Sequence, residues 1–378
     1  MKWTIIIIPL ITCTLLFAAE SESKRMVSNK YNDTTDVRFA SAINRATKDS
    51  FLAASRYNLA DLDVITTERK ATLFILGYSK MDREIEAWYF PGKSDKRALI
   101  IAGVHGSELS ALEIARELIT MLKEGNQPYY SVVIVPTLFP DNASKAIMKP
   151  ATINSVDNIG RYSYHGAVDP NRQMPSPGKP FIDSCAKDHV GRDIERENQL
   201  LLKLIRDFRP MRVANLHAIR NSKYGGVYAD PRTDHEGYAL GYETDSSLAV
   251  DMAKYIQGRG GNVAGNNLKK KPTALYYKDP IPAPAGMLQR RNMTGSILNA
   301  NRGSGVSLGT WGATAVVAED SALSRPAMRI ITIEYPGCKR PIDYKTPAER
   351  QYHQRQVKTF AEALAVNFLG EGYVEGVD

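Results

Sequence analysis

The stretch Ile100-Ile101-Ala102-Gly103-Val104-His105-Gly106-Ser107-Glu108 joins two kinds of sequence pattern. Its apolar, β-branched first half is typical of a strand buried inside a parallel sheet. Apolar residues then recur at helical spacing, so we expect a helix from Ser107, which is a suitable N-cap, to about Gly125. His105 and Glu108 are therefore expected at the carboxyl end of a strand, where open α/β sheets place their ligand sites.

A histidine and a carboxylate three residues apart can bind one metal ion, and zinc accepts both kinds of ligand. A His-x-x-Glu motif occurs often by chance, so by itself it predicts little. A catalytic zinc also needs a third protein ligand and an open position for water. Without these, His105 and Glu108 would only form a polar loop at the edge of a sheet.

Length and composition place the chain among globular proteins. Its 378 residues allow one large domain or two ordinary ones. The 49 Lys and Arg exceed the 41 Asp and Glu, and the formal charge of +8 suits an anionic partner without requiring one. The basic residues are scattered and match no nucleic-acid-binding motif, so no nucleic acid is expected as a partner.

Residues 1–21 resemble a secretory signal peptide. Lys2 precedes an apolar run that ends near Ala19, and small and polar residues follow. We therefore expect cleavage near residues 19–21 and an exported protein, either periplasmic or secreted. A retained anchor is the alternative, although the run is short for a membrane span; the membrane would then be a partner only through this segment.

Two cysteines, Cys185 and Cys338, lie beyond the expected cleavage site. An oxidising compartment would allow them to form a disulfide. Two separate buried thiols are an equally good expectation, because the sequence does not show whether their Cα atoms come close enough to be bridged.

The alternation of strands and helices predicts a doubly wound α/β fold: a mixed parallel and antiparallel sheet with helices on both faces. Residues 22–69 are expected to form a leader and a helical segment, and residues 70–370 a catalytic domain. Two long regions of this domain, 139–191 and 218–327, are expected to be insertions rich in loops. The expected strands are 71–78, 84–90, 100–102, 131–136, 212–216 and 328–335, and the expected helices are 37–56, 107–125, 195–208, 246–256 and 348–368.

Two further expected strands carry polar residues at or near their ends. One leads into His217, and the other holds Glu334 within an apolar run. A carboxylate in such a strand is unfavourable unless it has a partner. Together with His105 and Glu108, His217 would complete a His-Glu-His ligand set, and Glu334 would be available as a general base.

Taken in order, these motifs resemble the zinc metallocarboxypeptidase family, the carboxypeptidase A-like enzymes or funnelins, over residues 70–368. His105-Gly106-Ser107-Glu108 is similar to the segment that holds the family's first two zinc ligands, and His217 is similar to the third. Glu334 is similar to the family's general base. The resemblance implies a carboxypeptidase A-like fold and one zinc ion per chain.

The resemblance also implies residues that bind the substrate. Arg161 stands where the family has an arginine that polarises the scissile carbonyl. Asp169-Pro170-Asn171-Arg172 is similar to the family's Asp-x-Asn-Arg element, so Asn171 and Arg172 would hold a substrate carboxylate. A guanidinium offers a planar fork that suits this group. The expected partner is a peptide or muropeptide with a free carboxylate next to the scissile amide.

The sequence departs from the family pattern in two places. Phe139-Pro140-Asp141-Asn142 stands where the family often has Asn-Pro-Asp-Gly, and residues 309–313 offer no equivalent of the mobile-loop tyrosine of the digestive members. The segment 307–311 resembles one in bacterial members. With the expected signal peptide, it favours the bacterial exported branch of the family.

These observations predict an exported zinc-dependent carboxypeptidase, with peptidoglycan stem peptides as the natural substrate. A general peptide carboxypeptidase and an N-acyl amino acid deacylase are alternative hydrolases, and the signal peptide argues against the deacylase. A non-catalytic protein that binds peptides or cell wall is the alternative from another class. The presence of all three ligand types and of Glu334 argues against it.

Overall fold

The computed structural model describes residues 59–67, 70–155, 157–162, 168–241, 243–270, 272 and 305–372. They belong to one compact unit that spans residues 55–378. The expected signal peptide and the helix expected at 37–56 lie outside the described residues, as do residues 242, 271 and 273–304 of the expected insertion 218–327.

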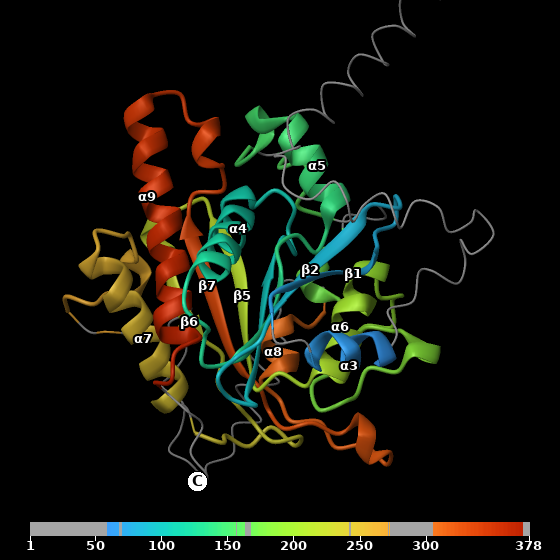
Figure 1. Ribbon diagram of the computed structural model, residues 1–378. Coiled ribbons are helices and arrows are strands. Elements are labelled where there is room, and N and C mark those ends of the chain that lie inside the picture. The colour runs from blue at the N-terminus through green and yellow to red at the C-terminus, as the bar shows by residue number, and fades with distance from the viewer. Residues whose placement is uncertain are drawn as a thin grey trace, which may run out of the picture. The chain divides into compact units, whose positions relative to one another are not determined.

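In the described part of the chain, seven strands form one sheet in the order β1-β2-β4-β3-β5-β7-β6 (Figure 1). The four central strands β4, β3, β5 and β7 are parallel, whereas the pairs β1–β2 and β2–β4 at one edge and β6–β7 at the other are antiparallel. The mixed sheet is therefore confirmed. The strands are β1 (Thr72–Tyr78), β2 (Glu84–Phe90), β3 (Arg97–Ala102), β4 (Ser131–Val135), β5 (Arg212–Ile219), β6 (Gly226–Ala229) and β7 (Arg329–Pro336).

Helices cover both faces of the sheet, as expected (Figure 1). The α-helices are α3 (Leu59–Thr67), α4 (Leu109–Glu124), α5 (Pro140–Met148), α6 (Arg196–Phe208), α7 (Glu243–Gly258), α8 (Leu308–Gly312) and α9 (Pro347–Ala363), and a π-helical turn, Leu364–Phe368, continues α9. The core on one face is shared with α4, α7 and α9, and the core on the other face with α3, α6 and α8. Short 3-10 turns lie at Pro150–Thr152, Pro170–Arg172, Asp183–Cys185, Ser222–Tyr224, Ala264–Asn266, Ser321–Leu323 and Pro341–Asp343.

Strand β3 shows why the central strands read as continuous apolar runs. Leu99 and Ile101 enter the core beside α6, whereas Ile100 and Ala102 enter the core beside α4. Successive side chains of a strand point to opposite faces, and a parallel strand with helices on both sides must be apolar on both.

Several boundaries differ from the sequence-based prediction. Helix α4 begins at Leu109 with Glu108 at its N-cap position, not at Ser107. The segment 139–191 contains α5, so it is not an uninterrupted loop, and strand β5 continues to Ile219. Strand β6 follows a glycine-containing turn and has only four residues. A strand this short has too few alternating residues to be recognised from the sequence pattern.

The two cysteines do not pair. Cys338 is buried, with its Sγ 3.5 Å from the carbonyl oxygen of Ala218, and Cys185 is exposed. The structure thus decides against the disulfide and shows one buried and one exposed thiol.

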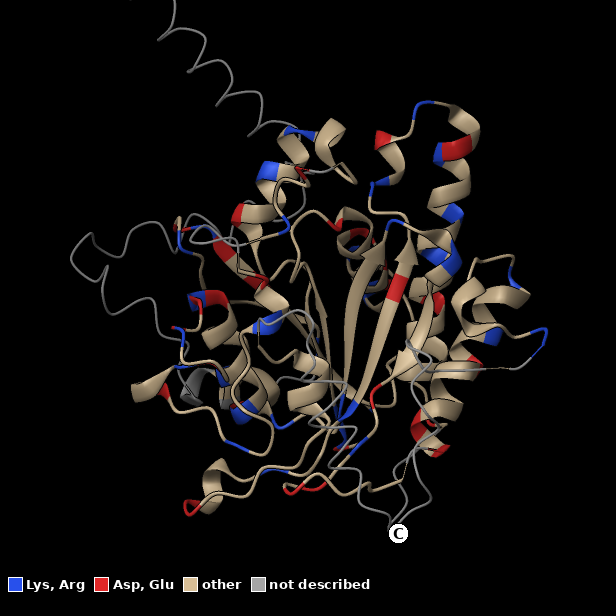
Figure 2. Cartoon of the chain, turned by 180° about the vertical axis from the view of Figure 1, so that it is seen from behind, with Lys and Arg blue, Asp and Glu red and all other residues tan. Residues whose placement is uncertain are grey.

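The charged residues do not collect on one element. Figure 2 shows Lys and Arg interspersed with Asp and Glu over the described elements. None of the helices in the described ranges combines the length and the apolar composition that crossing a membrane requires.

The amino end of β7 and the segment after β6 are tied to α7 by a buried charged cluster. Arg329 Nε donates to Asp245 Oδ1 at 2.6 Å, and Arg232 Nε donates to Asp245 Oδ2 at 2.7 Å. Asp245 and Arg329 are both fully buried. Burying such charges is unfavourable unless each has a partner, so the cluster holds the helix and the sheet in one arrangement.

Candidate metal centre

The loop between β3 and α4 is shaped by two glycines. Gly103 has a φ of +70°, a conformation that side chains disfavour. Gly106 lies against the first turn of α5, and a Cβ atom there would stand 2.3 Å from the backbone nitrogen of Ala143. The loop can therefore approach α5 closely, and this fixes the positions of His105 and Glu108.

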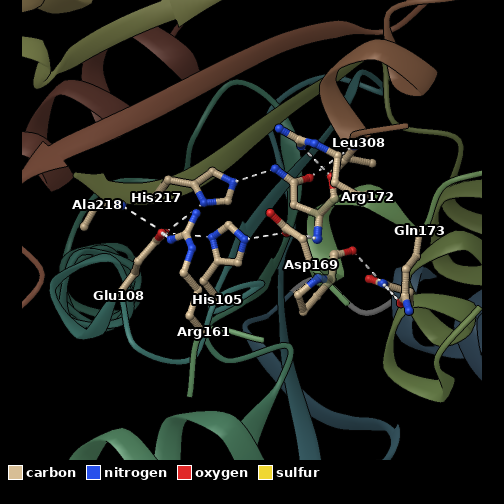
Figure 3. Close-up of polar contacts among 12 residues, drawn as sticks. His105, Glu108, Arg161, Asp169, Arg172, Gln173, His217, Ala218 and Leu308 are labelled. Atoms are coloured by element: carbon tan, nitrogen blue, oxygen red, sulfur yellow. Dashed lines mark hydrogen bonds and ion pairs between the residues drawn. The ribbon is translucent and has the colours of Figure 1, made fainter. Parts of the chain in front are cut away.

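Glu108 lies between two histidines, His105 on the loop after β3 and His217 on β5 (Figure 3). Its Oε1 is 2.9 Å from Nδ1 of His105, and its Oε2 is 2.8 Å from Nδ1 of His217. Oε2 also accepts a hydrogen bond of 3.1 Å from the backbone nitrogen of Ala218. All three side chains are buried, with exposed fractions of 3–4%.

This donor set fits a metal ion. The ligand atoms of His105, Glu108 and His217 all lie within 4.8 Å of one another. A tetrahedral zinc with bonds of about 2.0–2.2 Å separates its ligand atoms by about 3.4 Å, so small shifts would be sufficient. Two imidazoles and one carboxylate form a three-ligand set of the kind that leaves a position open in catalytic zinc sites.

The protonation states of Glu108 and His217 suit metal binding. Burial would lower the pKa of His105, but the charge of Glu108 and the contact with Asp169 outweigh it and raise that pKa. Burial alone would raise the pKa of Glu108, but the two neighbouring histidines outweigh it and hold the pKa well below the usual range. Burial lowers the pKa of His217, which favours the neutral imidazole. An ionised carboxylate and a neutral imidazole are the forms that coordinate metals.

Asp169 joins the site, although the sequence motifs predicted no separate role for this residue. Its Oδ1 lies 2.8 Å from Nε2 of His105, and the same oxygen accepts a hydrogen bond of 2.9 Å from the backbone nitrogen of Asn171. Burial would raise the pKa of Asp169, but the contact with His105 outweighs it and the pKa is lowered. The sequence feature that could have predicted this role is the position of Asp169 in the Asp-x-Asn-Arg element.

The structure brings Arg161 to the same carboxylate. Its Nη1 donates to Glu108 Oε1 at 2.7 Å. Burial would lower the pKa of Arg161, but the charges of Glu108 and Asp169 more than offset this and raise it. Arg161 is therefore a fixed positive charge beside the ligand set.

Asn171 and Arg172 form the 3-10 turn that follows Asp169. Asn171 Nδ2 lies 3.4 Å from Nε2 of His217, and its Oδ1 accepts a hydrogen bond of 3.2 Å from the backbone nitrogen of Leu308. Arg172 Nη1 donates to the carbonyl oxygen of Asn171 at 2.7 Å. The turn thus lies between the histidine on β5 and the start of α8 (Figure 3).

Glu334 lies beside His217 across two parallel strands. The two residues are register partners in the pairing of β5 with β7. Paired residues in adjacent strands project to the same face, and the strands are about 4.8 Å apart. Glu334 is half-buried, and burial together with its charge raises the pKa of Tyr228 on β6.

Comparisons with known proteins concern the fold. No family model matches the sequence, and no curated protein is similar to it. A carboxypeptidase A described as putative, from Shewanella denitrificans OS-217, has a TM-score of 0.43 and 13% identity, over 81% of this chain and 68% of that one. Bovine thrombin-activatable fibrinolysis inhibitor, in complex with tick carboxypeptidase inhibitor, has a TM-score of 0.46 and 14% identity, over 83% and 96% of the two chains.

The murein-tripeptide amidase MpaA from Escherichia coli O157 has a TM-score of 0.40 and 15% identity, over 78% of this chain and 91% of that one. The solved structures to which the chain is similar include several described as carboxypeptidases or metallopeptidases.

Proposed function

We propose that this chain is a metal-dependent hydrolase of the carboxypeptidase type, with zinc as its metal. The observation that supports this most strongly is the buried set of His105, Glu108 and His217, with Glu334 on the same face of the sheet. Four chemically suitable groups converge at the carboxyl ends of parallel strands, which is where folds of this class place their sites.

His105, Glu108 and His217 would hold the zinc ion, which would lower the pKa of a bound water to about 7. Glu334 is the carboxylate beside the ligand set that can accept a proton from water and return it to the leaving amine. Arg161 supplies a fixed positive charge at the place where the carbonyl oxygen becomes negative. Since Arg161 already contacts Glu108, its charge is oriented before the substrate arrives.

Asn171 and Arg172 define the proposed substrates. Arg172 is partly exposed, and a guanidinium and an amide together can donate several hydrogen bonds to one carboxylate. We therefore propose substrates with a free carboxylate next to the scissile amide. If residues 1–21 act as an export signal, peptidoglycan stem peptides in the periplasm are the natural candidates, because they carry such carboxylates.

The test is incubation of the protein lacking residues 1–21, loaded with zinc, with muropeptides and with peptides that have either a free or an amidated C-terminus. Products are read by mass spectrometry, with and without a zinc chelator. The proposal expects chelator-sensitive release of the terminal residue from the free-carboxylate substrates only. Loss of a terminal D-amino acid or diaminopimelate would support the muropeptide assignment, and cleavage of L-peptides alone would indicate a general carboxypeptidase.

Two other outcomes contradict the proposal. Release of N-acyl groups without cleavage of peptides would indicate a deacylase, and zinc binding with no hydrolysis of any substrate would indicate a binding protein. Arg172→Ala tests the substrate contact: KM should rise roughly tenfold to a hundredfold for free-carboxylate substrates. Arg196→Ala is the matched control, since Arg196 lies on α6 and its ion pair among the described residues is a 3.8 Å contact with exposed Asp82.

A further inference from the structure

A pocket between α6, α8 and residues 316–326 lies at the end of the sheet opposite to the metal centre. It is bordered by Met211, which directly precedes β5, and by Met328, which directly precedes β7. His217 stands near the other end of β5, about 20 Å further along at the rise of an extended strand. The pocket is therefore separate from the groups to which the proposed function assigns roles.

The walls of this pocket are mainly apolar. Among the residues that line it are Phe181, Leu202, Ile205, Val316 and Leu323. The cavity encloses about 110 Å³. An apolar cavity of roughly 150 Å³ in another protein accepts benzene, so this one has room for a short alkyl chain or a single ring and not for a peptide segment.

The charged residues of the lining are all arginines. Arg206, Arg209 and Arg325 line the pocket, and no carboxylate does. Arg206 is neutralised from outside the lining by Asp183 at 3.0 Å and by Asp207 at 2.9 Å. Within the part of the chain that the structure describes, Arg209 and Arg325 form no ion pair, so two positive charges at the pocket are not compensated.

The guanidinium of Arg325 is held in place by neutral groups. Its carbon Cζ lies 4.1 Å from the centre of the Trp311 ring, and Nη2 donates to the carbonyl oxygen of Trp311 at 2.7 Å. Nη1 donates to the carbonyl oxygens of Gly312 at 3.1 Å and Thr314 at 3.0 Å. The Nε atom is buried and has no hydrogen-bond partner among the described residues. The carbonyl groups orient this side chain, but they do not cancel its charge.

An uncompensated charge at this depth is unfavourable. Burial lowers the pKa of Arg325 to about 9, so the side chain is still charged at neutral pH. A buried charge without a counter-charge destabilises the fold, and an anion in the pocket would remove that penalty. An inorganic anion would leave the apolar walls uncovered, whereas a ligand with an alkyl chain or a ring would bury them as well.

We propose that this pocket is a second ligand site, which binds a small carboxylic acid with an apolar body. The carboxylate faces Arg325 and Arg209, because charge-assisted hydrogen bonds from guanidinium groups are the strongest that this lining offers. The alkyl chain or ring packs against Phe181, Leu202 and the other apolar residues of the wall. The site does not depend on the proposed hydrolase activity.

The experiment is calorimetric titration of the full-length protein with three probes. Hexanoate has the charge and the chain, hexanamide has the same shape without the charge, and inorganic phosphate has charge without a chain. We expect hexanoate to bind about tenfold to a hundredfold more tightly than hexanamide, because a hydrogen bond to a charged group is worth more than a neutral one. Phosphate should bind more weakly than hexanoate, because it covers none of the apolar wall.

Fluorescence shows where hexanoate binds. The chain has three tryptophans, and Trp3→Phe with Trp88→Phe leaves Trp311 as the only one. Since Trp311 lines the pocket and stacks on Arg325, hexanoate should change its emission at the concentrations that the titration gives. Arg172→Ala alters the proposed substrate contact at the other end of the sheet and should leave both the affinity and the emission change as they are.

Variants of the lining test both halves of the pocket. Arg325→Met should remove the preference of hexanoate over hexanamide. Because Arg325 also holds three carbonyl groups, Ala322→Leu is a second variant: Ala322 is exposed at the pocket, and the larger side chain should weaken both probes about tenfold or more by filling the cavity. Val317→Leu, at an exposed position outside the lining, is the control and should bind both probes as the wild type does.

Three results would overturn the inference. One is equal affinity of the wild-type protein for hexanoate and hexanamide, and another is no binding of hexanoate at millimolar concentration. The third is hexanoate binding that Arg172→Ala abolishes and Ala322→Leu leaves unchanged, because the probe would then occupy the proposed substrate site. The peptide-cleavage test of the proposed function is independent of all three.

Discussion

Asp169 and Glu108 contact opposite nitrogens of the same imidazole: Nε2 of His105 is 2.8 Å from Asp169 Oδ1, and Nδ1 is 2.9 Å from Glu108 Oε1. A carboxylate that accepts a hydrogen bond from Nε2–H leaves the lone pair of Nδ1 directed to the site. It also makes the imidazole a better ligand. Asp169 is therefore a positioning residue for His105.

Asp169→Asn tests this role. The neutral amide keeps the shape but loses the charge that supports the histidine, so zinc affinity should fall roughly tenfold to a hundredfold. Competition with a chromogenic zinc chelator measures the change. Asp183→Asn, at an exposed site paired with Arg206, is the control. An Asp169→Asn protein with wild-type zinc affinity would remove Asp169 from the site.

Glu334→Gln should separate the chemistry from metal binding. The amide cannot accept a proton from water, so kcat should fall by about 10²–10⁴ with zinc content unchanged. Rates and metal analysis on the same preparation provide the test. Glu86→Gln, on the exposed face of β2, should have no effect. Retained activity in Glu334→Gln would falsify the assigned general base.

Asp245 should matter for stability and not for chemistry. Asp245→Asn leaves Arg329 buried without its charged partner, and the free energy of unfolding should fall by about 3–5 kcal/mol. Asp251→Asn on the same helix removes an exposed pair with Lys254 and should change it by about 0–1 kcal/mol. Urea unfolding compares the two variants, and similar values for both would contradict the structural role of the cluster.

Asp230 should make the stability depend on pH in an unusual direction. Its pKa is raised from 3.8 to about 6 in the folded state, so the folded chain binds the proton more tightly than the unfolded chain. The free energy of unfolding should therefore decrease as pH rises from about 4 to 6, by about 1–3 kcal/mol.

Asp230→Asn lacks this titration. Relative to the wild type, the variant should gain nothing below about pH 4 and its full advantage above about pH 6. Urea unfolding of the metal-free proteins across this range measures the difference. A difference that is constant with pH would show that the Asp230 carboxyl has an ordinary pKa in the folded state.

Much of the fold could be predicted because local patterns carry it. The apolar runs of β1, β2, β4 and β7 are long enough to locate these strands within a residue at either end. The start of α4 was misplaced because Ser107 looks like a cap, whereas Glu108 holds the N-cap position without a side-chain capping bond. The Glu108 side chain is engaged by the two histidines instead.

The sequence by itself determined which side chains have the chemistry that the proposed zinc hydrolase requires and that they follow or lie within buried strands. Residue type and periodicity are local properties of the sequence, so they can be recognised without knowing any tertiary contact. It also determined the α/β class, because strands and helices alternate along the chain.

Only the tertiary structure decided which of these groups meet. Glu108 and His217 are 109 residues apart in the sequence. The Glu108 carboxylate contacts Nδ1 of His217 because β3 and β5 are adjacent in the sheet. The register of β5 on β7 places Glu334 beside His217, and the pairing of β6 with β7 brings Asp230 to the same face. Register and strand order depend on packing over the whole sheet, so no local stretch of sequence contains them.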